Sequence, residues 1–334
     1  MSERGILLRL LASIGALALG AIAVVIVSVL AHDTPGPASS ATVPLAPASP
    51  AATDTTPTTT SASATTPSLP PAKTAFPAPP NGAVVFFRPN GNQVVALGVV
   101  PGNQLKLQTS VLSGEGKGVP GLGVSYRVGS KQATATPCGD GCYVATVASP
   151  NAPKAVDVRI TGEKPVTWRV AMPERWPPPD ASQIMSRTTN AYRTLRTLTI
   201  DDSLSSGLGR TLFTHWTIAS PDKLTYQIQN GPAAVIIGPS RWDKVPGQRW
   251  VKSQQSPIHQ PTPFWVTWTD AHVLSQTPTA WHVSFFDPKT PGWYALTISK
   301  SSQRPAAMRM EAASHFMTQH FSGFNAPLHI APPK

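Results

Sequence analysis

The sequence is short of cysteine and of charged residues, and each shortage excludes a class of protein. Two cysteines in 334 residues cannot build a disulfide scaffold. Charged side chains make up 13% of the chain, and its 16 acidic residues form no convincing carboxylate pair. Stretch 114–118 lacks the spacing of a phosphate-binding loop, and stretch 238–242 lacks the second glycine of a nucleophile elbow. We therefore expect a protein that is not an enzyme and holds no cofactor.

Proline, by contrast, is abundant, and the chain is not one compact domain. The sequence contains 37 prolines and carries a formal net charge of +11. Composition changes along the chain predict a mainly β protein in four pieces. These are a membrane anchor with a short cytoplasmic tip, a linker, a β-sandwich and a curved sheet with one helix, at residues 1–31, 32–80, 81–174 and 175–334.

The first piece contains an uncharged apolar run over residues 10–31. About twenty such residues in a helix cross the roughly 30 Å hydrocarbon core of a bilayer. Arg4 and Arg9 precede the run, so the positive-inside rule leaves the N-terminus in the cytoplasm and the rest of the chain outside. We expect a single-pass anchor in the cell membrane. A cleaved signal peptide ending at Ala31 is the alternative, although its apolar part usually spans only about 7 to 15 residues.

The second piece, residues 32–80, is nearly all Pro, Ala, Ser and Thr. Such a composition offers too little apolar side chain to offset the entropy of ordering the chain, so we expect a disordered linker. Its length makes it a spacer between the membrane and the folded part.

The third piece contains eight short β-rich runs separated by turn residues, as in AVVFFR, QVVALGVV and AVDVRIT. This regular spacing predicts a small antiparallel sandwich of the immunoglobulin-like kind over residues 81–174. Cys138 and Cys142 flank a Gly-Asp-Gly turn, and outside the cytoplasm they are expected to form a disulfide. A metal-binding cysteine pair is the alternative, but this piece contains no histidine.

One hairpin of this piece resembles a known family. GDGCYVATV at 139–147, followed by KAVDVRITG at 154–162, looks like the penultimate hairpin of immunoglobulin-like domains in CopC-type copper-resistance proteins and their YtkA-like relatives. In that family histidines coordinate copper, and residues 81–174 supply none.

The fourth piece begins with one predicted helix. Three prolines and Asp180 form its start, because an aspartate accepts hydrogen bonds from free backbone N–H groups of the first turn. An apolar stripe then recurs at helical spacing, formed by Ile184, Met185, Ala191, Tyr192, Leu195 and Leu198. Asp201 and Asp202, which follow, are expected to form a turn at a strand end.

Everything after the helix alternates with period two, which predicts strands with one apolar face. Eight of the nine tryptophans lie beyond residue 175. So many aromatic residues under a single helix favour a hydrophobic cavity, although an ordinary core with the helix as its plug is the simpler interpretation. The predicted cavity walls are Leu212, Trp216, Ile218, Leu224, Tyr226, Ile228, Val283, Phe285, Tyr294 and Leu296.

The order of motifs in this piece is similar to the LolA, LolB and LppX group of envelope proteins, including the LolA-like half of RseB. The motifs are the strand start PDKLTYQIQ at 221–229, the FFDPKTPGWYALTIS hairpin at 285–299 and the closing FNAPLHIAPP at 324–333. The resemblance implies an unclosed barrel with a helix over its mouth that accepts an acyl chain, a lipid or a lipoprotein. Membrane attachment then falls to residues 10–31, because no lipidation cysteine follows them.

Two other functions stay open. His315, Met317 and His320 near the C-terminus, with Met308 and Met310, contain the ligand types that suit copper. On a strand, however, His315 and Met317 project to one face and His320 to the other, so we expect no metal site. The RseB-like relatives instead suggest a regulatory module that binds another envelope protein.

The positive charge does not indicate nucleic acid, because the basic part of the chain lies beyond the predicted membrane segment. Residues 175–334 hold fifteen Lys and Arg against eight Asp and Glu. An excess of this size suits anionic lipid headgroups or wall polymers, and it is equally typical of an ordinary soluble surface. No nucleic acid partner is expected.

Overall fold

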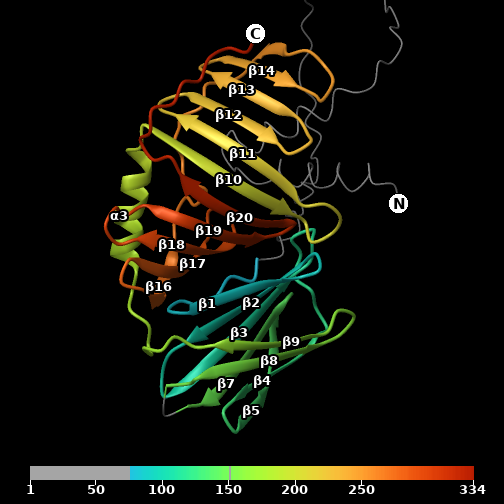
Figure 1. Ribbon diagram of the computed structural model, residues 1–334. Coiled ribbons are helices and arrows are strands. Elements are labelled where there is room, and N and C mark those ends of the chain that lie inside the picture. Colours follow the sequence, from blue (N-terminus) through green and yellow to red (C-terminus); the bar gives the residue numbers. More distant parts are fainter. Residues whose placement is uncertain (1–75, 150–151) are drawn as a thin grey trace, which may run out of the picture.

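The computed structural model describes residues 76–149 and 152–334, which form three antiparallel sheets and one helix (Figure 1). This agrees with the mainly β fold expected from the sequence. Residues 10–31, the predicted anchor, lie outside the described residues. Within the described ranges, no helix has the length and apolar character needed to cross a membrane.

Two of the sheets form the sandwich expected over residues 81–174. One has the order β1-β2-β3-β7-β6 and the other β5-β4-β8-β9. Branched aliphatic side chains from both sheets, among them Val95, Leu107, Val124 and Val158, fill the space between them. The strands are β1 (Val84–Asn90), β2 (Gln93–Val100), β3 (Gln104–Leu112), β4 (Gly123–Val128), β5 (Lys131–Thr134), β6 (Thr136–Gly139), β7 (Cys142–Ala148), β8 (Ala155–Thr161) and β9 (Val166–Ala171).

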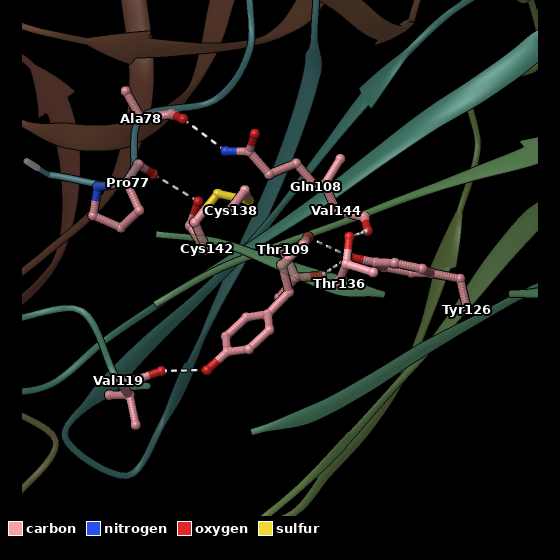
Figure 2. Close-up of a disulfide and its surroundings, with 12 residues drawn as sticks. Pro77, Ala78, Gln108, Thr109, Val119, Tyr126, Thr136, Cys138, Cys142 and Val144 are labelled. Atoms are coloured by element: carbon pink, nitrogen blue, oxygen red, sulfur yellow. Dashed lines mark hydrogen bonds between the residues drawn. A yellow bond between two sulfur atoms is a disulfide. The ribbon is translucent and has the colours of Figure 1, made fainter. Parts of the chain in front are cut away.

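The two buried tyrosine hydroxyls of this core both have hydrogen-bond partners. The Tyr126 hydroxyl lies 2.9 Å from both Thr109 Oγ1 and the Tyr143 carbonyl oxygen (Figure 2). The Tyr143 hydroxyl donates to the Val119 carbonyl oxygen at 2.6 Å. The predicted disulfide between Cys138 and Cys142 is present and joins β6 to β7.

The third sheet has eleven strands in the order β15-β14-β13-β12-β11-β10-β20-β19-β18-β17-β16, and it is not closed. It matches the half-barrel expected over residues 175–334. The last strand, β20, pairs with the first, β10, so the two ends of this region meet in the middle of the sheet. The strands are β10 (Thr197–Ser205), β11 (Leu212–Ala219), β12 (Lys223–Ile228), β13 (Ala233–Ile237), β14 (Ser240–Lys244), β15 (Val251–Gln254), β16 (Thr269–Gln276), β17 (Ala280–Asp287), β18 (Gly292–Ser299), β19 (Pro305–Ala312) and β20 (His315–Ser322).

The helix α3 (Ser182–Arg193) lies against one face of this sheet, which we call the inner face (Figure 1). Asp180 Oδ1 accepts a hydrogen bond from the Ser182 backbone N–H at 3.0 Å, as expected of a residue at a helix start. The helix ends earlier than the apolar stripe predicts: Leu195 follows it and Leu198 belongs to β10. The β-branched residues around Leu198 favour a strand, and both leucines are buried in the same core as the helix.

The sandwich packs directly on the other, outer face of the half-barrel (Figure 1). Val85 and Phe87 of β1 join Phe286 and Trp293 of β17 and β18 in one buried cluster. Strands β1 and β2 therefore have apolar neighbours on both faces. This explains their near-continuous hydrophobic sequences, which resemble those of fully buried strands.

A strap formed by residues 76–80 seals this contact, although they belong to the predicted linker. The Phe76 ring lies 5.7 Å from that of Phe286 and 5.4 Å from that of Trp293. Gln108 Nε2 donates to the Ala78 carbonyl oxygen at 2.7 Å, and Ser110 Oγ donates to that of Pro77 at 2.6 Å (Figure 2). The strap thus joins the sandwich and the half-barrel just before the first strand begins.

Candidate functional site

The structure gathers the predicted cavity walls on the inner face of the half-barrel. Nine of the ten residues are buried, and Leu212 is partly buried. All ten pack in one cluster with Met185 and Tyr192 of α3. They come from β11, β12, β17 and β18, whose alternating patterns placed them correctly on one face. That these side chains contact a ligand stays a prediction.

A loop between β15 and β16, residues 255–268, adds a second cover that the sequence did not reveal. Trp265 is buried to 1% exposure, and its Nε1 donates to Thr189 Oγ1 of α3 at 2.8 Å. Its ring meets that of Tyr192 edge to face, with the ring centroids 5.8 Å apart. Ile258 of the same loop joins the cluster as well. The inner face is therefore covered by the helix and by this loop together.

The buried carboxylate of Asp287 fixes that loop in place. Its Oδ2 accepts from the backbone N–H of Val266 at 2.6 Å and from the Thr290 hydroxyl at 2.6 Å. Its Oδ1 accepts from the backbone N–H of Lys289 at 2.8 Å. One side chain at the end of β17 thus ties the covering loop to the β17–β18 turn.

A row of polar side chains crosses the middle of the apolar inner face. Gln319 of β20 is the cross-strand neighbour of Asp202 of β10, which in turn faces Thr214 of β11. All three are buried, with Met308 next to Gln319 and Ile228 next to Thr214 at the two ends of the row. We call Asp202, Gln319 and the adjoining Trp216 the polar row.

The sequence analysis placed Asp201 and Asp202 in a turn at a strand end, and this is wrong. Both lie within β10, where Asp201 is exposed on the outer face and Asp202 is buried on the inner face. The sequence did contain a signal for the burial of Asp202. Leu198, Ile200 and Leu204 occupy alternate positions of the strand together with Asp202, so all four side chains point to the same face. An acid that interrupts the apolar positions of an alternating strand is itself an inward-pointing acid.

Three atoms of the polar row make no hydrogen bond of good geometry. They are Asp202 Oδ1, Gln319 Oε1 and Trp216 Nε1. Burial raises the pKa of Asp202 from its ordinary 3.8 to about 7, while hydrogen bonding with the Trp216 and Gln319 side chains acts to lower it. An unpaired buried polar atom costs about 1 to 3 kcal/mol, so such atoms are rare and are usually explained by a bound water, an ion or a functional role.

Other polar atoms around the same core are also unpartnered. The Tyr192 hydroxyl and Thr188 Oγ1 face it from α3. Burial raises the pKa of Tyr192 well above its usual range. His315 Nε2 on β20 has no partner either, while its Nδ1 lies 2.8 Å from the Ala313 carbonyl oxygen. The inner face is thus apolar overall but contains several hydrogen-bonding groups without counterparts.

Strand parity separates the histidine and methionine side chains near the C-terminus between the two faces of β20. His315 and Met317 are buried on the inner face, whereas His320 is exposed on the outer face, as strand parity requires. Met308, Met310 and Met317 belong to the apolar cluster. Within residues 76–149 and 152–334, no group of three His, Cys, Asp or Glu side chains is arranged so that it could hold a metal ion. Burial lowers the pKa of His315, which therefore stays uncharged near neutral pH.

Two hollows open elsewhere on the described surface. One, of about 530 Å³, lies on the outer face around Asp201, His215 and His320, with Phe213 at 52% exposure. The other, of about 470 Å³, lies between the sandwich and the half-barrel around Phe87, Trp168 and Arg309. There Arg309 donates to the Phe87 carbonyl oxygen at 2.7 Å. None of the ten predicted wall residues lines either hollow.

Comparison with known proteins gives similarities of fold. No family model matches the chain, and no curated protein matches it. Among solved structures, lipoprotein LppX of Mycobacterium tuberculosis shares 10% identity at a TM-score of 0.33, covering 45% of this chain and 97% of LppX.

Two further solved structures match a similar share of this chain. A DUF1329 family protein of Desulfovibrio piger shares 9% identity at a TM-score of 0.26, over 45% of this chain and 96% of its own. A LolA superfamily protein of Nitrosomonas europaea shares 11% identity at a TM-score of 0.23, over 46% of this chain and 96% of its own. Any ligand must therefore be inferred from the residues of this chain themselves.

Proposed function

We propose that the half-barrel binds a lipid or another elongated apolar ligand between its inner face, α3 and the covering loop. The observation that carries the proposal is the inner face itself. It is an open sheet of eleven strands whose apolar side is covered by one helix and one loop. Ligand sites in proteins are mostly apolar with a few placed polar groups, and this face has that composition.

The contents of the inner face suit a flexible apolar guest. Met185, Met308, Met310 and Met317 lie around it, and unbranched methionine side chains adapt to ligands of different shape. Stacked rings add flat apolar wall, as in the Phe285 and Tyr294 pair, whose centroids are 5.1 Å apart. The unpartnered polar atoms described above would provide contacts for a less apolar part of the guest.

We further propose that the protein acts outside the cytoplasm, anchored by residues 10–31 with the linker as a spacer. The charge-free run and the arginines before it support this orientation. The Cys138–Cys142 disulfide is in keeping with an oxidising compartment. The protein is proposed to have no enzymatic activity of its own.

Native mass spectrometry of the full chain, released from detergent micelles, tests the binding function directly. We expect an added mass of several hundred daltons that organic extraction identifies as lipid. The variant Tyr294→Trp, which enlarges a wall residue at the stacked pair, should reduce the bound fraction, while Phe213→Trp on the outer face should leave it unchanged.

Two results would contradict the proposal. Stoichiometric copper in place of lipid would favour the copper-handling alternative, which His315→Ala with Met317→Ala would then abolish. A chain that never carries a small molecule, but co-purifies with one envelope protein in constant ratio, would favour the interaction module.

A further inference from the structure

The hairpin formed by β14 and β15, residues 240–254, is one free edge of the half-barrel. Strand β15 is the last of the eleven in the sheet order, and β14 lies at the end of the half-barrel away from the sandwich (Figure 1). All four residues of β15 are exposed. Within the part of the chain that the structure describes, β15 pairs with β14 and with no other strand. This hairpin is therefore open to a partner.

The exposed charges of the hairpin are all positive. Lys244, Arg249 and Lys252 are exposed. The other two charged residues neutralise each other, because the buried Arg241 donates to Asp243 Oδ2 through Nε at 2.7 Å and to its Oδ1 through Nη2 at 2.6 Å. The hairpin thus holds three exposed cations and no exposed acid that offsets them.

Two partly buried tryptophans lie on the same face of the hairpin as two of these cations. Lys252 is the cross-strand neighbour of Trp242, and its Nζ lies 5.3 Å from the centre of that ring. Lys244 Nζ lies 5.6 Å from the centre of the Trp250 ring. Both rings pack against a small apolar cluster that includes Ile330, which holds them at the surface.

This combination suits the surface of a bilayer better than a soluble polyanion. Charges on an edge strand often only prevent pairing with another sheet, but lysines alone would serve that purpose. Tryptophan is enriched where an apolar phase meets water, and lysine stems lie along apolar surface while their ammonium groups reach the headgroups. Val251 on β15 is 63% exposed, more than any other large apolar side chain in the described ranges. A soluble polyanion would use the cations but not these apolar groups.

We propose that the β14–β15 hairpin docks on an anionic phospholipid bilayer. Lys244, Arg249 and Lys252 contact the headgroup phosphates, and anionic lipids attract such cations. The rings of Trp242 and Trp250 lie at the boundary between headgroups and acyl chains. This contact is separate from the predicted anchor, and it does not depend on what the inner face of the half-barrel holds.

A fluorescent label in the turn of the hairpin tests the proposal on the full chain. Gln248→Cys in that exposed turn supplies one free thiol, because the native cysteines form a disulfide. The thiol takes a nitrobenzoxadiazole group, whose emission shifts to the blue in an apolar environment. The labelled chain, held in phosphatidylcholine nanodiscs, is titrated with vesicles of phosphatidylcholine alone or mixed with phosphatidylglycerol. We expect the shift at a lipid concentration on the order of a hundredfold lower for the anionic vesicles, because each of three cations contributes about fivefold.

Charge reversal assigns this preference to the hairpin. Lys244→Glu with Lys252→Glu should abolish the preference for anionic vesicles. The matched control is Lys106→Glu with Lys131→Glu, which changes the net charge equally at two exposed lysines of β3 and β5 in the sandwich and should leave the preference unchanged. Arg249→Gln in the exposed turn should weaken binding about fivefold, and it tests the proposal if the first double variant fails to fold.

Three results would overturn the inference. Anionic vesicles that cause no shift in emission would show that the hairpin does not dock. Equal losses in the two double variants would mean that net charge, and not this hairpin, attracts the vesicles. Dextran sulfate that binds through the hairpin lysines, while vesicles cause no shift, would identify the partner as a polymer. Each of these results leaves the proposed ligand binding at the inner face untouched, because that function is read from the mass of a bound guest.

Discussion

The two β-rich cores of this protein differ in how completely they satisfy their own polar groups. In the sandwich, the buried Tyr126 and Tyr143 hydroxyls both have partners within 2.9 Å. In the half-barrel, Tyr192, Trp216, Asp202 and Gln319 each leave an atom unpaired. Within residues 76–149 and 152–174, no buried side chain shows such an unpaired atom.

The difference indicates two kinds of interior. Small branched residues pack the sandwich closely, which is the usual way in which a core specifies one structure. The core of the half-barrel contains many aromatic rings and methionines, and it is covered by α3 and by the loop of residues 255–268. It also contains buried polar atoms without well-aligned partners, which cost stability. The sandwich thus satisfies its own polar groups, whereas the half-barrel interior leaves some of its polar atoms without well-aligned partners. The following changes test that contrast.

The largest effect is expected for Trp265→Ala in the covering loop. The substitution removes a fully buried ring, its contact with Tyr192 and its hydrogen bond to Thr189. Loss of such a side chain costs about 3 to 5 kcal/mol in the free energy of unfolding, measured by chemical denaturation. Trp268→Ala, on the same loop but only partly buried, is the control and should cost distinctly less. Equal losses would mean that Trp265 does not act as the cover.

Asp202→Asn should change how the stability of the ligand-free protein depends on pH. The pKa of Asp202 is about 7 in the folded protein against 3.8 ordinarily, so between these values the folded state binds a proton that the unfolded state has lost. The free energy of unfolding therefore falls as pH rises from about 4 to 7, by on the order of 3 kcal/mol from this group.

In the Asn variant that contribution disappears, and urea unfolding at pH 5 and pH 8 should differ less than in the wild type. Burial also raises the pKa of Glu311 to about 7, so its contribution remains in the variant. Glu311→Gln is therefore the parallel control at the contact with the sandwich. A pH profile identical to that of the wild type would contradict a buried, neutral Asp202.

Removal of the disulfide tests the sandwich. Cys138→Ser with Cys142→Ser opens a loop of about five residues, and the chain-entropy relation gives about 2 kcal/mol for it. We expect a sandwich that stays folded and loses about that amount, seen in thermal unfolding. Because the bond lies in the sandwich and outside the inner-face cluster, lipid binding should not change. Complete unfolding would show that the aliphatic core is weaker than its packing indicates.

The smallest effect is expected on the outer face. Asp201 Oδ1 lies 2.7 Å from His215 Nδ1, but both side chains are more than half exposed. Exposed pairs of this kind contribute about 0 to 1 kcal/mol, so Asp201→Asn should leave the unfolding free energy nearly unchanged. A loss as large as that of a buried group would contradict the assignment of Asp201 to the solvated face.

Prediction from sequence succeeded where one strand or one turn contains the whole signal. Alternation placed Trp216, Tyr226, Phe285 and Tyr294 on one face, and a five-residue stretch placed the disulfide. Prediction failed at two places where the local sequence contained the information but was interpreted as an ordinary turn or an ordinary strand. Asp202 interrupts an alternating strand, and the unbroken hydrophobic run of β2 indicates burial on both faces.

The sequence by itself determined the strands, most of their inward-facing residues and the presence of α3, because period-two alternation and turn residues act over a few neighbouring positions. Only the tertiary structure decided that Trp265 contacts α3, that Phe76 and the sandwich cover the outer face at β17 and β18, and that Gln319 lies beside Asp202. The two residues of each contact are separated by between 76 and more than 200 positions of the chain. No local pattern specifies which distant strands meet. The polar row exists only after β10 and β20 have paired.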